Sequence, residues 1–147
     1  MKKLLIMLMV VLLCGCGSNS SANNLDINGA SKALDEAYTD MLVMDDTQLE
    51  VIYGLDLSLL EEYVVKYSSK NNGDFYAILK TDSSNKNEVK AQMANMFSVL
   101  ETQNSLYTPE AVALIKNHLE TSVGDYLIYL VGQDTEALYN VVKDYIK

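Results

Sequence analysis

The residue types that usually carry catalysis are scarce in this 147-residue chain, which contains one histidine, two cysteines and no arginine. His118 lies at a predicted junction between a helix and a strand, where we expect a partly exposed side chain without a catalytic or ligating role. A Ser-His-Asp triad would need this same histidine, and the chain has no Gly-x-Ser-x-Gly turn to present a nucleophile. The side chains therefore predict no catalytic residue and no cofactor.

Carboxylates occur as adjacent pairs at Asp35-Glu36, Asp45-Asp46 and Glu61-Glu62. Neighbouring residues point about 100° apart on a helix and to opposite sides of a strand, so adjacency alone does not build an acid–base pair. We interpret these residues as helix caps and solvated faces. The pair at 45–46 could contribute to a weak calcium site, but the spacing of an EF-hand loop is missing, and we predict no metal site.

Residues 1–15 have the features of a secretory signal peptide. Two lysines precede an unbroken apolar run, and a small residue stands at the end. The apolar run covers residues 4–13, which is too short for a permanent membrane span of about 20 residues. We therefore predict that this segment is removed and that no transmembrane segment follows it.

The thiol of Cys16 is the one side chain for which the sequence predicts a reaction. Residues 13–16, Leu-Cys-Gly-Cys, resemble a bacterial lipobox. We predict cleavage between Gly15 and Cys16 and attachment of a diacylglyceryl group to the Cys16 sulfur as a thioether. Two acyl chains suffice for stable membrane anchoring. A secreted protein in which Cys16 is incidental is the alternative.

The segment after the predicted cleavage site separates the anchor from the folded part of the chain. Residues 16–24 consist of the lipidated cysteine and small polar residues that predict a flexible tether. Eight extended residues reach at most about 27 Å. We therefore expect a single domain, residues 25–147, close to the outer face of the cytoplasmic membrane.

The acidity of the chain excludes one class of partner. The chain has 20 acidic residues, 11 lysines and a net charge of −9, and loss of two lysines with the signal peptide changes this to 9 − 20 = −11. Such a surface repels phosphate backbones, so we expect no binding to nucleic acid. Because Cys14 would be removed and Cys16 acylated, no thiol would remain for a disulfide or a metal.

Helix and strand signals alternate along residues 25–147 in the manner of an α+β domain. Strands are predicted at 63–67 and 75–80, and a second hairpin turns at Gly124-Asp125 into a strand at 126–131. The predicted helix N-caps are Ser31, Thr47 (with Glu50 completing a capping box), Asp56, Thr108 (with Pro109 at the first helical position) and Asp134. The predicted buried positions of the helices are Leu34, Ala37, Tyr38, Met41 and Leu42, then Val89, Met93, Met96, Phe97 and Leu100, then Val112, Ile115 and Leu119, and finally Leu138, Val141, Val142, Tyr145 and Ile146.

The two hairpins lead to a specific fold prediction. We expect a four-stranded antiparallel sheet built from two hairpins, with helices packed on one face and an N-terminal helix before it. A Gly-Asp pair opens the second strand of each hairpin, at 73–74 and 124–125, and a helix follows each hairpin. These hairpin-helix units are either a duplication or a coincidence.

Tyrosine is unusually abundant, with ten tyrosines against two phenylalanines and no tryptophan. Tyr63 and Tyr67 share one face of a predicted strand, and Tyr76 and Tyr129 lie in the middle of two other strands. A sheet face lined by these four residues could stack on sugar rings or hold a protein partner. The alternative is that these tyrosines border an ordinary core.

Several short segments together resemble a known bacterial family. They are the Gly-Cys junction at 15–16, YGLD at 53–56 leading into EEYVVK at 61–66, and GDY at 124–126. These segments are similar to those of bacterial lipoproteins with the domain of unknown function 4358, which are found mostly in Gram-positive bacteria. The resemblance implies an extracytoplasmic address and one domain type, and it implies no catalytic residue.

The sequence supports two function hypotheses of different classes. The first is a non-enzymatic, membrane-anchored module of the cell envelope that binds an envelope protein or a cell-wall component. The second is an envelope hydrolase that works with carboxylates, with or without a divalent cation. A two-lobed solute-binding protein is disfavoured because two lobes rarely fit in so short a chain.

Overall fold

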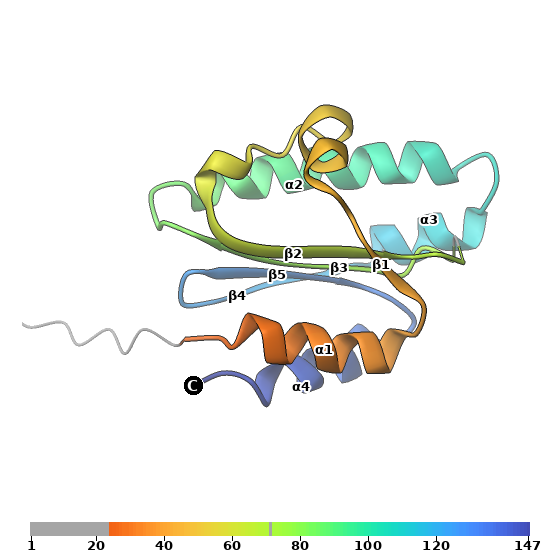
Figure 1. Cartoon of the computed structure of the whole chain (residues 1–147). Coiled ribbons are helices and arrows are strands. Elements are labelled where there is room, and N and C mark those ends of the chain that lie inside the picture. The colour runs from red at the N-terminus through yellow and green to blue at the C-terminus, as the bar shows by residue number, and fades with distance from the viewer. Residues whose placement is uncertain (1–23, 71) are drawn as a thin grey trace, which may run out of the picture.

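A computed structural model describes residues 24–70 and 72–147, and Figure 1 shows a sheet between two layers of helices. The elements in chain order are α1 (Ile27–Tyr38), β1 (Met41–Val43), the π-helical turn η1 (Gln48–Ile52), the 3-10 turn η2 (Leu57–Leu59), β2 (Leu60–Ser68), β3 (Phe75–Thr81), α2 (Lys86–Asn104), α3 (Pro109–Lys116), β4 (Leu119–Val123), β5 (Tyr126–Val131) and α4 (Thr135–Lys143). The sheet has five antiparallel strands in the order β1-β2-β3-β5-β4. The predicted α+β class is confirmed.

The prediction of four strands is wrong because residues 41–43, expected at the end of the first helix, form the edge strand β1. Thr39 and Asp40 adopt positive φ angles of 67° and 54°, which end α1 and turn the chain back onto β2. No glycine stands at this turn to indicate the end of the helix. The helical spacing of apolar residues therefore continues in the sequence through Met41 and Leu42. A three-residue strand is stabilised by its partner rather than by its own propensity.

The first helix also begins earlier than predicted. Asp26 caps α1 by accepting a hydrogen bond from the Gly29 N–H at 3.0 Å, so Ser31 lies inside the helix rather than at its start. The Ser31 hydroxyl instead meets the Tyr76 hydroxyl at 2.8 Å. Gly29 is required in the first turn because a Cβ there would lie 2.6 Å from the ring of Tyr145.

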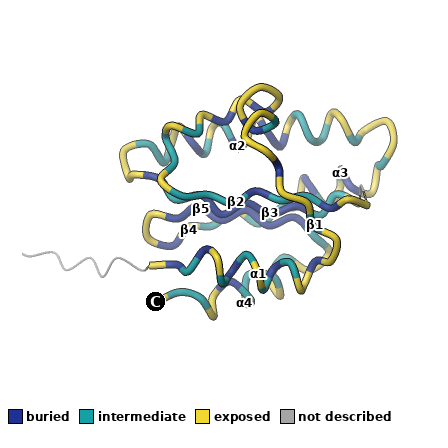
Figure 2. The backbone as a smooth tube through the Cα atoms, in the orientation of Figure 1, coloured by how far each residue is buried: buried dark blue, intermediate teal, exposed yellow. Residues whose placement is uncertain are grey.

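The prediction of helices on one face is wrong: α2 and α3 cover one face of the sheet, and α1 and α4 cover the other (Figure 1). Strands β3 and β5 lie between both layers and are buried almost throughout (Figure 2). The core on the α2 side includes Val65, Phe75, Ala77, Leu79, Val89, Met93, Met96, Phe97, Leu127, Tyr129 and Val131. The core on the α1 side includes Ile27, Ala30, Leu34, Tyr38, Tyr76, Ile78, Tyr126, Ile128, Leu130 and Val142.

The positions of the helices also decide between duplication and coincidence. The two hairpins meet along the antiparallel pair β3–β5. They are therefore related by a twofold rotation about an axis perpendicular to the sheet. This rotation exchanges the hairpins but does not exchange the two faces of the sheet. The helices that follow the hairpins, α2 and α4, nevertheless lie on opposite faces (Figure 1). The two hairpin-helix units therefore have opposite hand, and a tandem duplication does not account for them.

Most of the predicted helix starts are confirmed, because caps depend on neighbouring residues. Thr108 precedes α3 with Pro109 at the first turn. The Asp134 side chain accepts a hydrogen bond from the Ala137 N–H at 2.9 Å and caps α4. Asp56 caps the turn η2 in the same way.

The predicted capping box at Thr47 and Glu50 is wrong. The reciprocal pair lies two residues earlier, where Asp45 Oδ1 accepts from the Gln48 N–H at 2.9 Å and Gln48 Oε1 accepts from the Asp45 N–H at 3.1 Å. The turn that follows is π-helical rather than α-helical.

The predicted buried positions of the helices are partly confirmed. In α2, Val89, Met93, Met96 and Phe97 are buried, and Leu100 is partly buried against them. In α3, Ala111 and Ile115 are the buried residues, whereas Val112 is half-exposed. Leu119 does not extend this helix, because it is the first residue of β4. In α4, Val142 is fully buried, and Leu138, Val141, Tyr145 and Ile146 pack around the core.

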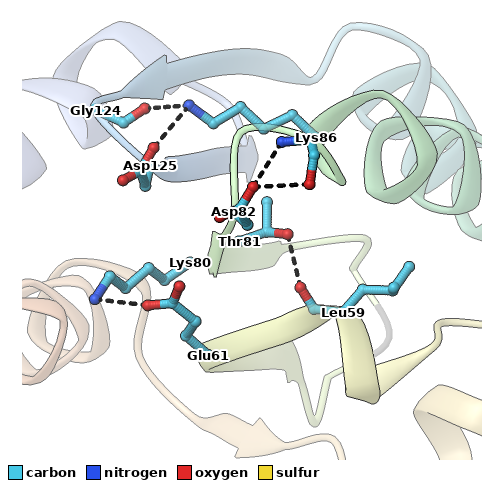
Figure 3. A network of polar contacts seen from close by, with 9 residues as sticks. Leu59, Glu61, Lys80, Thr81, Asp82, Lys86, Gly124 and Asp125 are labelled. Carbon is cyan, nitrogen blue, oxygen red and sulfur yellow. Dashed lines mark hydrogen bonds and ion pairs between the residues drawn. The ribbon is translucent and has the colours of Figure 1, made fainter.

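One end of the sheet is closed by polar contacts (Figure 3). The Thr81 hydroxyl donates to the Leu59 carbonyl oxygen at 2.7 Å and joins the ends of β2 and β3. Lys86 Nζ at the start of α2 donates to the carbonyl oxygen of Gly124 at 2.5 Å and lies 3.3 Å from Asp125 Oδ1. The turn between β4 and β5 is thereby joined to the start of α2.

Candidate functional site

The opposite end of the sheet contains a cavity of about 190 Å³. It lies where β2 ends, β3 begins and the C-terminal part of α2 passes above them. The residues that line it are Met44, Gln48, Tyr53, Tyr67, Ser68, Gly73, Asp74, Phe75, Leu100, Gln103, Asn104 and Ile115. These residues come from segments far apart in the sequence, which is why no local motif marks the site.

Two features of the backbone shape this cavity. After β1 the chain folds back over α2 through η1, and Leu49 and Tyr53 are buried against the core on the α2 side. On the other side, the turn between β2 and β3 lies directly against α3. Gly73 has φ +90°, and a Cβ there would come within 2.8 Å of the Cα of Ala111. Glycine at position 73 therefore permits the close approach that closes this wall.

The polar groups of the cavity are mostly uncharged. The Tyr53 hydroxyl donates to Gln103 Oε1 at 3.3 Å, and burial raises the pKa of this phenol. Asn104 is fixed within its own loop, because its Nδ2 donates to the Leu100 carbonyl oxygen at 2.8 Å and its Oδ1 accepts from the Thr108 hydroxyl at 2.6 Å. The cavity thus combines amides and phenols with apolar walls.

Asp74 is the only carboxylate among the described residues that line the cavity. The Asn72 Nδ2 donates to its Oδ2 at 2.7 Å. Burial raises the pKa of the Asp74 carboxyl above its usual value, while the hydrogen bond from Asn72 opposes this change. The sequence identified Asp74 only as part of the Gly-Asp pair before a strand, and its place beside a cavity could not be predicted from neighbouring residues.

The cavity has the size and chemistry for a small polar ring. One water molecule needs about 10–15 Å³ of cavity volume. A cavity of about 190 Å³ can therefore hold several waters or one small ring. Amide and phenol groups can donate to and accept from hydroxyls, and Tyr67 and Phe75 offer apolar faces. Glycoside hydrolysis by the usual pair of carboxylates would need a second carboxylate, and among the described lining residues Asp74 is the one present.

The four tyrosines considered as a possible binding face do not all lie on one side of the sheet. Tyr63 and Tyr67 face the α2 side and are partly buried, and of these Tyr67 lines the cavity. Tyr129 also faces α2, but it is 1% exposed. Tyr76 is fully buried on the opposite face of the sheet, beneath α1. Tyr76 and Tyr129 are therefore core residues in this structure.

The two core tyrosines differ in how their hydroxyls are satisfied. The Tyr76 hydroxyl donates to Asp35 Oδ1 at 2.8 Å, and Lys66 Nζ lies 2.6 Å from Asp35 Oδ2. The Tyr129 hydroxyl is buried without a hydrogen-bond partner among the described residues. Burial raises the pKa of both phenols, and both are neutral at physiological pH.

This difference predicts opposite results for the same substitution. Tyr76→Phe should lower the free energy of unfolding by about 1.5–3 kcal/mol, because it removes a hydrogen bond to a charged group. Tyr129→Phe should leave stability unchanged or raise it, because it removes an unsatisfied buried hydroxyl. Urea unfolding of the two variants beside the wild type measures both effects, and equal losses would contradict this description of the core.

The other residues considered in the sequence have structural contacts. His118 is half-buried, its ring stacks on Phe97 at 4.0 Å between centroids, and its Nδ1 lies 2.7 Å from the Ile115 carbonyl oxygen. In the pair at 45–46, Asp45 caps the next turn and Asp46 accepts from the Tyr63 hydroxyl at 2.7 Å. No group of three or more histidine, cysteine or acidic side chains suited to a metal occurs among residues 24–70 and 72–147.

The predicted lipidation and cleavage sites, Cys16 and Gly15, lie outside the described residues. Within the part of the chain that the structure describes, none of the helices has both the length and the apolar character needed to cross a membrane.

A family model for a domain of unknown function (DUF4358) matches residues 34–132, which is more than half of the chain. The chain belongs to this family. The DUF4358 match runs from the middle of α1 to the residue after β5 and includes every residue that lines the cavity. Comparison with curated proteins and with solved structures returned no match.

Proposed function

We propose that this protein is a lipid-anchored module of the bacterial cell envelope that binds a neutral sugar residue of a cell-wall polymer in the cavity at the end of the sheet. The diacylglyceryl group on Cys16 holds it at the outer face of the cytoplasmic membrane, and it acts without catalysis. One observation carries this proposal: the cavity lies at the end of the sheet opposite Asn24, the first described residue after the tether.

The positions of the two ends support a division between anchor and binding site. Asn24 Oδ1 accepts from the Tyr126 hydroxyl at 3.0 Å, which fixes the start of the domain at the beginning of β5. Phe75, which lines the cavity, pairs with Val131 at the other end of that strand. Five residue steps along a strand cover roughly 17 Å. A tethered domain can therefore present its cavity away from the membrane.

The charge of the protein favours a neutral ligand. A net charge of −9 over the whole chain, or −11 after the predicted cleavage, opposes wall polymers rich in phosphate or carboxylate. Asp74 adds a carboxylate to the cavity itself, where burial already raises its pKa. Hydroxyl and amide groups on a sugar ring match the amides of Gln48 and Gln103, and the ring of Tyr67 offers a surface for stacking.

Calorimetric titration with soluble glycan fragments of the wall tests the proposal on the mature protein in nanodiscs. Tyr67→Ala should weaken binding at least about tenfold, which corresponds to about 1.4 kcal/mol. Tyr139→Ala is the matched control, because Tyr139 is also half-exposed but lies on α4, in the helix layer on the opposite face of the sheet. We expect this control to bind as the wild type does.

Two results would count against the proposal. The first is an absence of glycan binding up to millimolar concentration. The second is equal weakening by both tyrosine substitutions, which would point to general destabilisation. Release of shortened glycans during the titration would favour the envelope hydrolase instead.

A further inference from the structure

The first part of β2 has an outer edge without a strand partner. β1 pairs only with Lys66, Tyr67 and Ser68, so residues 60–65 extend beyond it. The Met44 N–H donates to the Val65 carbonyl oxygen at 3.0 Å, which shows that the backbone groups of Val65 point outward. Because these groups alternate along a strand, the N–H and C=O of Tyr63 point outward as well. Within residues 24–70 and 72–147, no strand pairs with Tyr63 on this side.

An open groove with exposed apolar side chains follows this edge. Its volume is about 890 Å³, and its walls are β1 and the turn η1 on one side and β2 on the other. Val43, Val51 and Ile52 are 66%, 78% and 51% exposed. Large apolar side chains that remain exposed beside an unpaired strand are characteristic of an interaction surface.

The charges around the groove have one sign. Asp45 and Asp46 line it, and no basic side chain is among the described residues that do so. Glu61, exposed at the start of the same edge, does not add to this charge because its Oε2 lies 2.9 Å from Lys80 Nζ. Lys66, the basic residue of β2, is only 14% exposed at its side chain and pairs with Asp35 beneath α1.

We propose that the edge of β2 at residues 60–65 is a docking site for an extended, basic segment of another protein, which adds as a strand in line with β1. The outward backbone groups of Tyr63 would hydrogen-bond to the added strand, and apolar side chains on the face of that strand toward η1 would lie against Val51 and Ile52. Because successive residues of a strand point to opposite faces of the sheet, lysines or arginines that share the face of these apolar side chains would face the carboxylates of Asp45 and Asp46.

The same charges argue against a second copy of this chain as the occupant. Two β2 edges paired with each other would bring Asp45 and Asp46 of both molecules together, and the whole chain is strongly acidic. Charged residues on an exposed edge are a common defence against such self-pairing. The groove adjoins the cavity, since Met44 and Gln48 line both, but the docking proposal does not depend on sugar binding.

A ten-residue peptide that carries lysine and valine in turn on one strand face, with threonine at the positions between (Lys-Thr-Val-Thr-Lys-Thr-Val-Thr-Lys-Thr), is a direct probe, and the same peptide with glutamate for lysine is the charge control. The mature protein should bind the basic peptide and show slowed amide hydrogen exchange at Tyr63. Val51→Lys should weaken this binding at least about tenfold. Leu106→Lys should not weaken it, because Leu106 is equally exposed at 79% but lies in the loop between α2 and α3.

Each of the other outcomes would overturn the docking proposal. Equal binding of the acidic peptide would remove the charge argument. Binding of the basic peptide without protection at Tyr63 would mean adsorption to the acidic surface in general. No binding up to millimolar peptide would show that the edge does not accept a strand. Protection that appears without peptide as protein concentration rises would mean that a second copy is the occupant.

Discussion

Replacing Phe97 by alanine should lower the free energy of unfolding by about 3–5 kcal/mol. Phe97 is 3% exposed on α2, stacks on His118 and meets the rings of Phe75 and Tyr129 at 5.5 and 5.7 Å between centroids. The substitution removes a large side chain from between the helix and the sheet, and the surrounding rings cannot fill the space. Since the free energy of unfolding of a small domain is only about 5–15 kcal/mol, this variant should retain little stability.

Urea unfolding followed by circular dichroism measures this effect. Val51→Ala is the control, because Val51 is 78% exposed and its substitution should change stability by less than about 0.5 kcal/mol. A loss below 1 kcal/mol for Phe97→Ala would mean that α2 does not pack on the sheet as described. The two-sided arrangement of the helices would then be wrong.

Replacing Cys16 by alanine should release the protein from the membrane or leave its precursor uncleaved. The expected anchor is a pair of acyl chains, each methylene of which contributes about 0.8 kcal/mol to membrane binding. Without them, a domain with net negative charge has no other predicted attachment to an anionic surface. The expected change is therefore complete loss of the diacylglyceryl anchor, so that the protein is either released or held only by its uncleaved signal peptide.

Cell fractionation combined with mass spectrometry of the N-terminal peptide measures both location and acylation. Cys14→Ala is the matched control, because it also removes a thiol near the junction but leaves the predicted acceptor in place. This control should remain diacylated and membrane-bound. A Cys16→Ala protein that is anchored and diacylated like the wild type would refute the lipobox interpretation.

The parts of the fold that depend on neighbouring residues were predictable from the sequence. Asp134 and Pro109 mark helix starts because caps and the fixed φ of proline act within one turn. The Gly124-Asp125 turn gave the second hairpin for the same reason. The long helix α2 followed from apolar residues at helical spacing.

The arrangement of layers was harder to predict because it depends on distant contacts. Residues 126–131 are apolar or aromatic without alternation, which is typical of a strand covered on both faces. This signal was present in the sequence, and it contradicts helices on one face only. The strand β1 gave no such signal, because Thr39 and Asp40 turn the chain at positive φ without a glycine.

The cavity could not be predicted from local patterns. Tyr67 was recognised as a candidate binding residue, but Gln48, Asp74 and Gln103 belong to a turn, a loop and a helix that meet only in the folded chain. The four candidate tyrosines could not be distinguished from one another by sequence alone. The structure does so by burial, because Tyr67 is partly exposed whereas Tyr76 and Tyr129 are core residues.

The most direct test of the proposed function is photocrosslinking from the anchored protein in living cells. A photoreactive amino acid at position 103 replaces Gln103, an exposed residue that lines the cavity. The control position is 136, because Glu136 is exposed on α4, on the other face of the sheet. Mass spectrometry identifies what each position captures. We predict wall glycan attached at position 103 and not at position 136. Equal capture at both positions, or capture of proteins alone at position 103, would contradict a sugar-binding cavity.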